Sequence, residues 1–331
     1  MLKRTLGKSG IEVSALGMGC WAIGGPWTWH NPGENPWPAG WGHVDDQEST
    51  RAIHAALDAG VSLFDTAANY GAGHSEKVLG EALRGRRDEA VILTKFGHVV
   101  NEAEKVVYRD DDQILGNVRT DVENSLRRLQ TDVIDVYQLH QGSYDTKLAP
   151  GLRSVLEDLV GEGKIRWYGW STDLVDRAEV FATGEHCTSI QFSLNAIFDN
   201  QEMRALCEQN GLAGVNKDPL NRGILTGKFT TDSTFPKDDI RSETDFHEDR
   251  IVKRLELVEA LRGSLTSGGR TMAQGALAYI WALDDRMVPI PGFRSVEQVQ
   301  QNAGAMKFGP LSEDEVRTIQ SIVAELLPQD L

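Results

Sequence analysis

The chain has 331 residues, of which 40% are hydrophobic and 25% are charged, and its formal net charge is −15 at pH 7. That length is enough to bury a sizeable core, either as two ordinary domains or as one large α/β barrel. The acidic balance argues against nucleic acid and anionic membranes as partners, so binding of an anionic ligand needs a local cluster of Arg or Lys.

The sequence also indicates the compartment. Residues 1–10 lack the apolar core of a secretion signal, and no run approaches ~20 apolar residues, so we expect a cytoplasmic protein that does not cross a membrane. The three cysteines, Cys20, Cys187 and Cys207, are widely spaced and form no Cys-x-x-Cys pair. This pattern fits a reducing compartment and gives no metal motif.

Residues 3–17 predict a β-hairpin with a turn at Lys-Ser-Gly. Gly17, Gly19 and Ala22 then match the Gly-x-Gly-x-x-Ala dinucleotide fingerprint, which binds pyrophosphate only where its glycines open a helix. Four prolines follow between residues 26 and 38, so we reject that interpretation. The segment 21–41 holds five of the eight tryptophans, and we predict a long rigid loop that packs over something.

After this loop the chain alternates between helices and short apolar strands. Asp45 and Glu48 predict a capping box at the start of a helix that ends near Gly60. Further helices are expected near residues 75–85, 118–129, 152–164, 175–183, 201–211, 272–284, 295–306 and 312–326. The strands between them are expected near residues 61–67, 91–97, 133–140, 165–172, 189–195, 212–218 and 287–292.

With the strand that runs into Gly17, this gives eight strands, each followed by a helix. Their continuous apolar cores are typical of parallel strands, so we predict one (β/α)8 TIM barrel domain over residues 1–331, preceded by the β-hairpin. Long connections follow strands 1, 3 and 7, reaching to about residue 44, from 97 to 113, and from 219 to about 270. Long loops on the strand-end face are usually lids or binding loops.

Polar residues end successive strands, and right-handed crossovers place all these ends on one face of a barrel. The residues expected to share this bowl are Asp65, Lys95, His140, Ser171, Thr172, Gln191, Asn195 and Lys217, with Tyr70 just beyond Asp65. Taken alone, each residue has an ordinary structural explanation: a strand-end Asp often forms a turn, a Tyr often fills the core, and a His often makes only structural hydrogen bonds. Three strands that end in ionisable groups at the same end favour a functional site.

These residues resemble the aldo-keto reductase superfamily. The chain carries its Phe-Asp-Thr-Ala-x-x-Tyr-Gly signature at 64–71, its Thr-Lys strand end at 94–95, its Leu-His strand end at 139–140, and a Pro-Leu-x-x-Gly-x-Leu-Thr-Gly-Lys phosphate loop at 219–228. Residues 290–292, Ile-Pro-Gly, resemble the adenosine-phosphate segment of the family. The motifs follow the family's order over essentially the whole chain.

The resemblance implies reversible hydride transfer between a nicotinamide cofactor and a small carbonyl or alcohol substrate. Tyr70 would be the general acid in reduction, with its pKa lowered by the ammonium of Lys95. The carboxylate of Asp65 would keep the amine of Lys95 in its charged form and direct it towards Tyr70. His140 would orient the carbonyl, its neutral form donating one hydrogen bond.

The resemblance also implies a cofactor site. Ser171, Thr172 and Gln191 would hold the nicotinamide carboxamide, and the amides of the phosphate loop would bind pyrophosphate. The complete expected set is Gly19, Trp21, Asp65, Ser171, Thr172, Gln191, Lys217, Asp218, Pro219, Leu220, Gly223, Leu225, Gly227, Lys228, Gly292, Arg294, Gln298 and Asn302.

Three positions in that set affect cofactor choice and geometry. Lys217 stands where the family often stacks an aromatic ring on nicotinamide, and Thr172 replaces a common amide side chain. Arg294 would bind the ribose 2′-phosphate, so NADPH/NADP+ is the expected cofactor, with NADH usable but weaker.

Two other functions are compatible with a barrel. A cofactor-sensing regulatory subunit with little turnover would share the fold, and a hydrolase with paired carboxylates would need acids at two or more strand ends, where only Asp65 qualifies. The complete set of Asp65, Tyr70, Lys95 and His140 favours an enzyme. The Trp-rich loop suits sugars, aryl aldehydes and terpenoids equally, and the sequence makes no prediction of an oligomeric state.

Overall fold

The computed structural model describes residues 2–327. Its central feature is a wall of eight parallel strands in the order β14-β13-β12-β11-β10-β7-β6-β3. The strands are β3 (Gly17–Gly19), β6 (Leu63–Asp65), β7 (Val91–Phe96), β10 (Ile134–Leu139), β11 (Ile165–Ser171), β12 (Cys187–Ser193), β13 (Ala213–Lys217) and β14 (Met287–Pro289).

An isolated β-bridge joins the two ends of this sheet. Gly19 pairs with Gly292, and the Gly19 amide donates to the Pro291 carbonyl at 3.0 Å. A Cβ atom at Gly19 would lie 2.8 Å from the carbonyl oxygen of Ile290, so only glycine permits this close approach. The predicted (β/α)8 barrel is confirmed.

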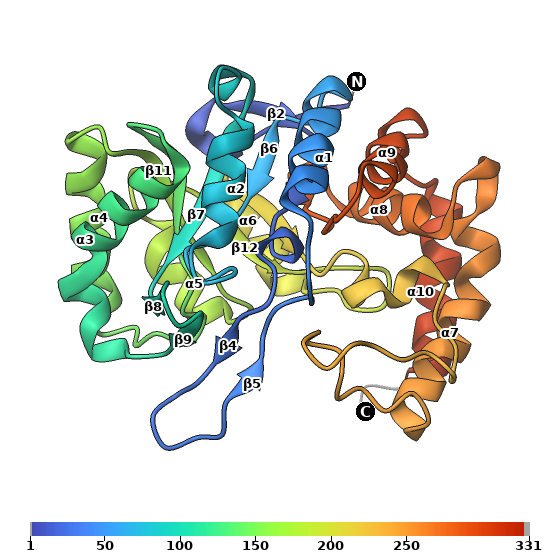
Figure 1. Ribbon diagram of the computed structural model, residues 1–331. Coiled ribbons are helices and arrows are strands. Elements are labelled where there is room, and N and C mark those ends of the chain that lie inside the picture. Colours follow the sequence, from blue (N-terminus) through green and yellow to red (C-terminus); the bar gives the residue numbers. More distant parts are fainter. Residues whose placement is uncertain (1, 328–331) are drawn as a thin grey trace.

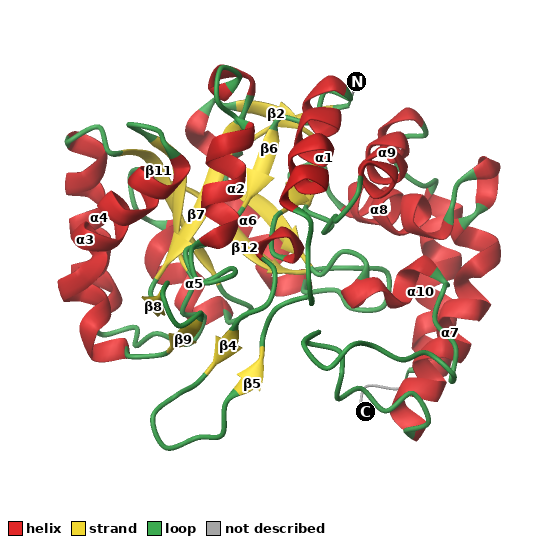
Figure 2. Cartoon of the chain, in the orientation of Figure 1, coloured by secondary structure: helices red, strands yellow, loops and turns green. Residues whose placement is uncertain are grey.

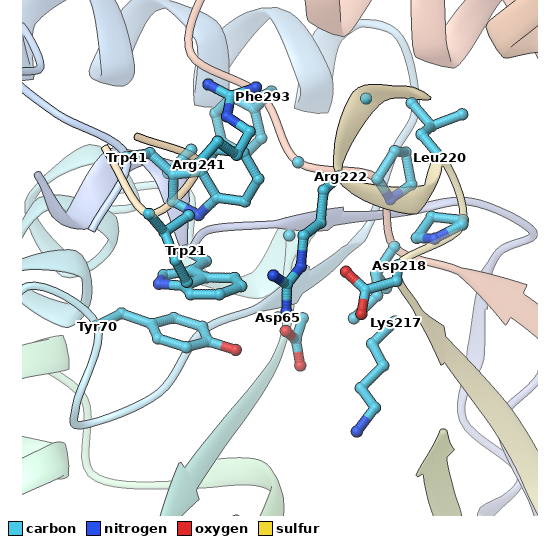
Figure 3. A pocket seen from close by; sticks show the side chains of 18 of the residues that line it. Trp21, Trp41, Asp65, Tyr70, Lys217, Asp218, Leu220, Arg222, Arg241 and Phe293 are labelled. Carbon is cyan, nitrogen blue, oxygen red and sulfur yellow. The ribbon is translucent and has the colours of Figure 1, made fainter. Parts of the chain in front are cut away.

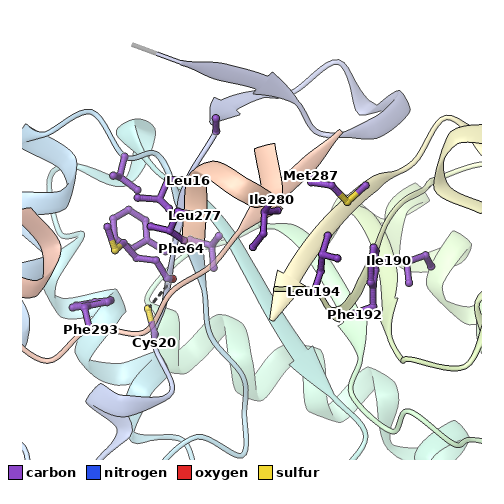
Figure 4. Close-up of a cluster of buried hydrophobic side chains, with 14 of the residues drawn as sticks. Leu16, Cys20, Phe64, Ile190, Phe192, Leu194, Leu277, Ile280, Met287 and Phe293 are labelled. Carbon is purple, nitrogen blue, oxygen red and sulfur yellow. Dashed lines mark hydrogen bonds between the residues drawn. The ribbon is translucent and has the colours of Figure 1, made fainter. Parts of the chain in front are cut away.

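Helices surround the strands, as Figures 1 and 2 show. They are α1 (Asp46–Asp58), α2 (His74–Ala82), α3 (Asp111–Leu129), α4 (Ala149–Gly161), α5 (Val175–Ala182), α6 (Gln201–Asn210), α8 (Met272–Leu283) and α9 (Val296–Gly304), with α7 (Asp249–Leu265) and α10 (Glu313–Leu326) in addition. Their apolar faces form one continuous core with the outward side chains of the strands. Figure 4 shows part of that core, where Leu16, Phe64 and Leu277 lie close together. No helix within residues 2–327 is long and apolar enough to cross a membrane.

The predicted hairpin is confirmed as β1 (Lys3–Thr5) paired antiparallel with β2 (Glu12–Ser14). Leu6 and Val13 from the hairpin belong to a second buried cluster with Leu63, Leu93 and Val136 from the strands. The hairpin therefore covers one end of the barrel, and the polar strand ends are left for the opposite end.

The long connections are more ordered than expected. The Trp-rich segment contains β4 (Thr28–Trp29) and β5 (Trp37–Pro38), and the connection after β7 contains β8 (Val99–Asn101) and β9 (Val106–Tyr108). These strands form one four-stranded sheet in the order β5-β4-β9-β8. The prediction of a long rigid loop did not include this pairing, because the pairing partners lie about 78 residues apart, as the register of Thr28 with Val106 shows.

The third long connection contains the 17-residue helix α7, which was not predicted from the sequence. One expectation needs correction. The capping box at the start of α1 is incomplete: Asp45 accepts from the amides of Gln47 and Glu48 at 2.8 and 3.3 Å, but Glu48 accepts from the Val296 amide at 2.9 Å. Glu48 thus ties α1 to the start of α9 instead of closing its own cap. Gly17 and Gly19 lie in β3, as the rejection of the dinucleotide fingerprint predicts.

Candidate active site

A cleft of about 770 Å³ lies at the carboxyl ends of the barrel strands, and the long connections form its rim. All five tryptophans of segment 21–41 line this cleft, together with most of the residues predicted from the sequence. Figure 3 shows Tyr70, Asp65 and Lys217 pointing into one space below the loop that carries Leu220. Of the predicted residues, Lys95, Asn195, Leu225 and Gly227 do not line it, and Asn195 instead donates to the Asp218 carbonyl at 3.1 Å.

Lys95 lies directly beneath the cleft and is completely buried. Its Nζ donates to the Asp65 carboxylate and to the Thr66 carbonyl, each at 2.8 Å, and to the Tyr70 hydroxyl at 3.3 Å. Gln191 donates to the same carboxylate at 2.7 Å. The strand ends therefore bring acid, amine and phenol into one hydrogen-bonded cluster, as expected from a parallel barrel.

Two aromatic contacts fix the ring of Tyr70. Trp21 stacks on it with ring centroids 5.8 Å apart, and His140 meets it edge-on at 5.7 Å. The His140 Nδ1 lies 2.9 Å from the Asn69 Oδ1. A carboxamide oxygen only accepts, so Nδ1 carries the hydrogen in this arrangement and Nε2 is an acceptor.

The expected donation from His140 to a carbonyl needs the opposite tautomer. A half-turn of the Asn69 carboxamide would let its NH2 group donate to Nδ1 and would put the hydrogen on Nε2. The orientation of Asn69 therefore sets which hydrogen bond His140 offers to a substrate.

The expected lowering of the Tyr70 pKa by Lys95 was wrong for this site. Burial raises the pKa of Tyr70 well above its ordinary value, and the carboxylates of Asp65 and Asp218 raise it further. Lys95 does not offset this rise, because it is paired with Asp65 and burial lowers its own pKa. Tyr70 is therefore a neutral phenol at pH 7.

Burial acts in the opposite direction on His140, because it disfavours the charged imidazolium. Together with the nearby His98 and Lys95, burial lowers the pKa of His140 well below its ordinary value. His140 is therefore neutral at pH 7. Burial also raises the pKa of Asp65, and the adjacent Lys95 opposes that rise.

The nicotinamide side of the expected cofactor site is assembled from β11, β12 and β13. Ser171 donates to the Gln191 carboxamide oxygen at 3.3 Å, and Thr172 donates to the Gly142 carbonyl at 2.6 Å. Lys217 forms an ion pair with Asp173 at 2.9 Å, so the lysine that replaces an aromatic ring is held by a carboxylate across the cleft wall.

The phosphate loop forms a 3₁₀ helix over Asn221–Thr226 with left-handed backbone at several positions. The amides of Gly223 and Leu225 donate to the Leu220 carbonyl at 3.0 and 3.2 Å. In this conformation both amides are therefore hydrogen-bonded within the turn and are not free to donate to a pyrophosphate, contrary to expectation. Lys228 and Leu220 do line the cleft.

The expected adenosine end of the cofactor site is the start of α9. The Arg294 amide donates to the Gln298 side chain at 2.7 Å, and its guanidinium donates to the His43 carbonyl. Ser295 caps the helix by accepting from the Gln298 amide at 3.3 Å. Asn302 donates to the Gly292 carbonyl at 3.3 Å and so holds the segment against the barrel.

Several cleft residues were missed by sequence reasoning, and all lie outside the barrel strands. They include Asn69, His98, Arg222, Phe229, Ile240 and Arg241. Asn69 and Arg222 had a usable signal, since Asn69 precedes Tyr70 within the signature and Arg222 lies within the phosphate loop. The others lie in connections whose course depends on contacts far along the chain.

Arg241 illustrates those distant contacts. It packs over Trp41 at 4.5 Å and over Phe235 at 3.9 Å, and Asp239 holds it through two hydrogen bonds of 2.7 and 2.8 Å. Nothing in the local sequence indicates that Arg241 meets a tryptophan 200 positions earlier.

A barrel that gathers a buried Lys–Asp pair, a tyrosine and a histidine at its strand ends defines an oxidoreductase of the aldo-keto reductase type. The Aldo/keto reductase family model matches residues 15–324, and the chain belongs to that family. Members of the family are NAD(P)-dependent oxidoreductases that act on carbonyl and alcohol groups. The predicted family and enzyme class are confirmed.

Individual relatives show the same likeness over nearly all of the chain. Aldo-keto reductase YhdN from Bacillus subtilis is 33% identical over 288 residues, covering 85% of this chain and 80% of the relative. The NADH-specific methylglyoxal reductase of Escherichia coli is 30% identical over 339 residues, covering 99% of each.

Solved structures agree with the fold. The glycerol dehydrogenase AKR11B4 from Gluconobacter oxydans has a TM-score of 0.82 at 31% identity, covering 99% of this chain and 97% of that one. An aldo-keto reductase from Klebsiella pneumoniae in complex with NADPH has a TM-score of 0.69 at 27% identity, covering 99% and 97%.

Proposed function

We propose that this protein is an NADP(H)-dependent aldo-keto reductase that interconverts an aldehyde, ketone or sugar carbonyl and the corresponding alcohol. Tyr70 is its general acid in reduction and its general base in the reverse direction. The observation that carries the proposal is the cluster in which Lys95 contacts both Asp65 and the Tyr70 hydroxyl, with His140 against the same ring. This complete set supports turnover over the cofactor-sensing alternative.

Each residue has a defined part in the reaction. NADPH, when bound, would supply the hydride that the carbonyl carbon accepts. Tyr70 holds its proton at rest, because burial raises its pKa, and gives that proton to the carbonyl oxygen. Lys95, at 3.3 Å, stabilises the negative charge as it develops on the phenol oxygen. His140, neutral at pH 7, orients the carbonyl by donating from Nε2, in the tautomer that a half-turn of the Asn69 carboxamide stabilises.

The cleft residues fit such a cofactor. Ser171 and Gln191 present polar groups beside Asp65, Lys217 and Lys228 supply positive charge, and Arg294 lies at the far end. A second arginine is not present at Gln298, so we expect NADP(H) to be preferred and NADH to be used more weakly. The NADPH complex of the Klebsiella relative and the NADH specificity of the Escherichia coli relative support both parts of this expectation.

The setting of the enzyme is part of the proposal. We propose one barrel domain over residues 1–331, a small molecule as the only class of substrate, and a cytoplasmic location. The net charge of −15 disfavours nucleic acid, and the three cysteines are buried and free.

Replacement of Tyr70 by Phe tests the assignment. The substitution keeps the ring against Trp21 and removes only the proton donor, so turnover should fall by about 10² to 10⁴-fold. The Kd for NADPH, measured by fluorescence titration, should stay within about threefold of the parent value because no cofactor contact is removed. Turnover within a few-fold of the parent, with chemistry limiting the rate, would refute the role of Tyr70.

A further inference from the structure

His98 lies in the cleft beside the proposed reaction centre, yet none of the chemistry above uses it. It follows β7 by two residues, three positions after Lys95. Its ring centroid lies 5.0 Å from that of His140, with the rings inclined by 60°. The same ring lies 5.0 Å from Trp29, edge to face. His98 is thus the next side chain along the wall after His140.

The hydrogen-bonding capacity of His98 is unused by the protein. Within residues 2–327 no protein group hydrogen-bonds to its ring, and neither ring nitrogen is among the fully enclosed polar atoms of that part of the chain. Burial lowers the pKa of His98 to about 4, so the ring is neutral at pH 7 and offers one donor and one acceptor. The ring is partly exposed and lines the cleft, so a bound substrate would shield it from water and would have to supply its hydrogen-bond partner.

We propose that His98 binds a second oxygen atom of the substrate, so that the preferred substrates carry a hydroxyl group one or two carbons from the reacting carbonyl. The inference rests on the proposed function, because it takes Tyr70 and His140 as the groups that hold the reacting oxygen. His98 adjoins His140 on the wall, so the second oxygen belongs to a neighbouring part of the same small molecule. α-Hydroxy aldehydes and sugars have this pattern.

The surrounding wall suits the same class. Trp29 and Trp37 stack with centroids 6.0 Å apart, and Trp37 is 44% exposed at the mouth of the cleft. Flat indole faces pack against the C–H faces of a polyhydroxylated chain, while His98 supplies the polar contact. A plain alkyl aldehyde would leave the desolvated His98 without a partner, which disfavours it relative to the hydroxylated compound.

The test compares two aldehydes of the same shape. Glyceraldehyde carries two hydroxyl groups, and 2-methylbutanal has a methyl group in place of each of them. We would measure kcat/KM for both with NADPH in the parent, in His98→Phe and in His98→Gln. His98→Phe keeps a ring against Trp29 and His140, and His98→Gln restores a donor and an acceptor.

The expected result is selective. His98→Phe should lose roughly 5- to 50-fold in kcat/KM for glyceraldehyde and stay within about threefold for 2-methylbutanal. His98→Gln should recover part of the loss, and the Kd for NADPH should be unchanged in both variants. An equal loss for both aldehydes would show that His98 only supports His140, which overturns the inference and leaves the proposed function standing. A parent enzyme that does not prefer glyceraldehyde to 2-methylbutanal would overturn the inference alone, and a parent enzyme that reduces no aldehyde, ketone or sugar with NADPH would overturn both.

Discussion

Arg294 should decide between NADPH and NADH. Its position at the start of α9, beside the cap Ser295, puts a guanidinium and helix-terminal amides at the adenosine end of the cleft. One guanidinium nitrogen donates to the His43 carbonyl, which aims the side chain and leaves other N–H groups for an anion. The ribose 2′-phosphate of NADPH is the part of the cofactor that such a group distinguishes.

The size of the effect follows from removing one charged hydrogen-bond partner, which costs roughly 1.5 to 3 kcal/mol. Arg294→Ala should therefore weaken NADPH binding about ten- to a hundredfold and leave NADH binding nearly unchanged. Arg294→Lys is the matched control, since it keeps the charge without the planar fork and should lose less.

Fluorescence titration of both cofactors against the three proteins measures this directly. Raising the salt concentration should weaken NADPH binding to the parent more than to Arg294→Ala, because the lost interaction is between charges. An equal loss of NADH and NADPH affinity would refute the reasoning and show that Arg294 supports the shape of the site through His43.

The remaining predictions concern the substrate side. Trp29→Ala or Trp37→Ala should raise KM for bulky aldehydes with an unchanged Kd for NADPH, and an effect on thermal stability alone would make the four-stranded sheet purely structural. Asn69→Ala should lower kcat about tenfold or more, because His140 loses the group 2.9 Å away that sets its tautomer, whereas an unchanged kcat would show that His140 needs no such partner.

The sequence allowed the site to be predicted where its residues lie on barrel strands. Asp65 and Lys95 are 30 positions apart, but they end neighbouring parallel strands, and the alternation of helices and strands was enough to bring them together. The same logic placed Gln191 beside Asp65 across the barrel. Periodicity and element order determine these contacts.

The connections could not be predicted in the same way. The pairing of β4 with β9 joins two loops that carry no shared local signal, and it is this pairing that brings Trp29 to His98. The amide directions in the phosphate loop depend on backbone angles, such as the left-handed φ of 52° at Arg222, that residue type alone does not fix. Residues such as His98 therefore became visible only from the structure.

The raised pKa of Tyr70 shows that the pKa of a buried group depends on its burial and on all the surrounding charges, and not on the nearest charge alone. Lys95 lies 3.3 Å from the phenol, but Asp65 lies 2.8 Å from Lys95 and cancels much of its field on a neutral hydroxyl. Burial then keeps the proton on Tyr70 at rest, which is the state a general acid needs. Once the proton leaves, the oxygen is charged and the ammonium is its nearest donor, so the stabilisation appears when the transition state requires it. In the proposed mechanism, Lys95 therefore assists catalysis without lowering the resting pKa of Tyr70.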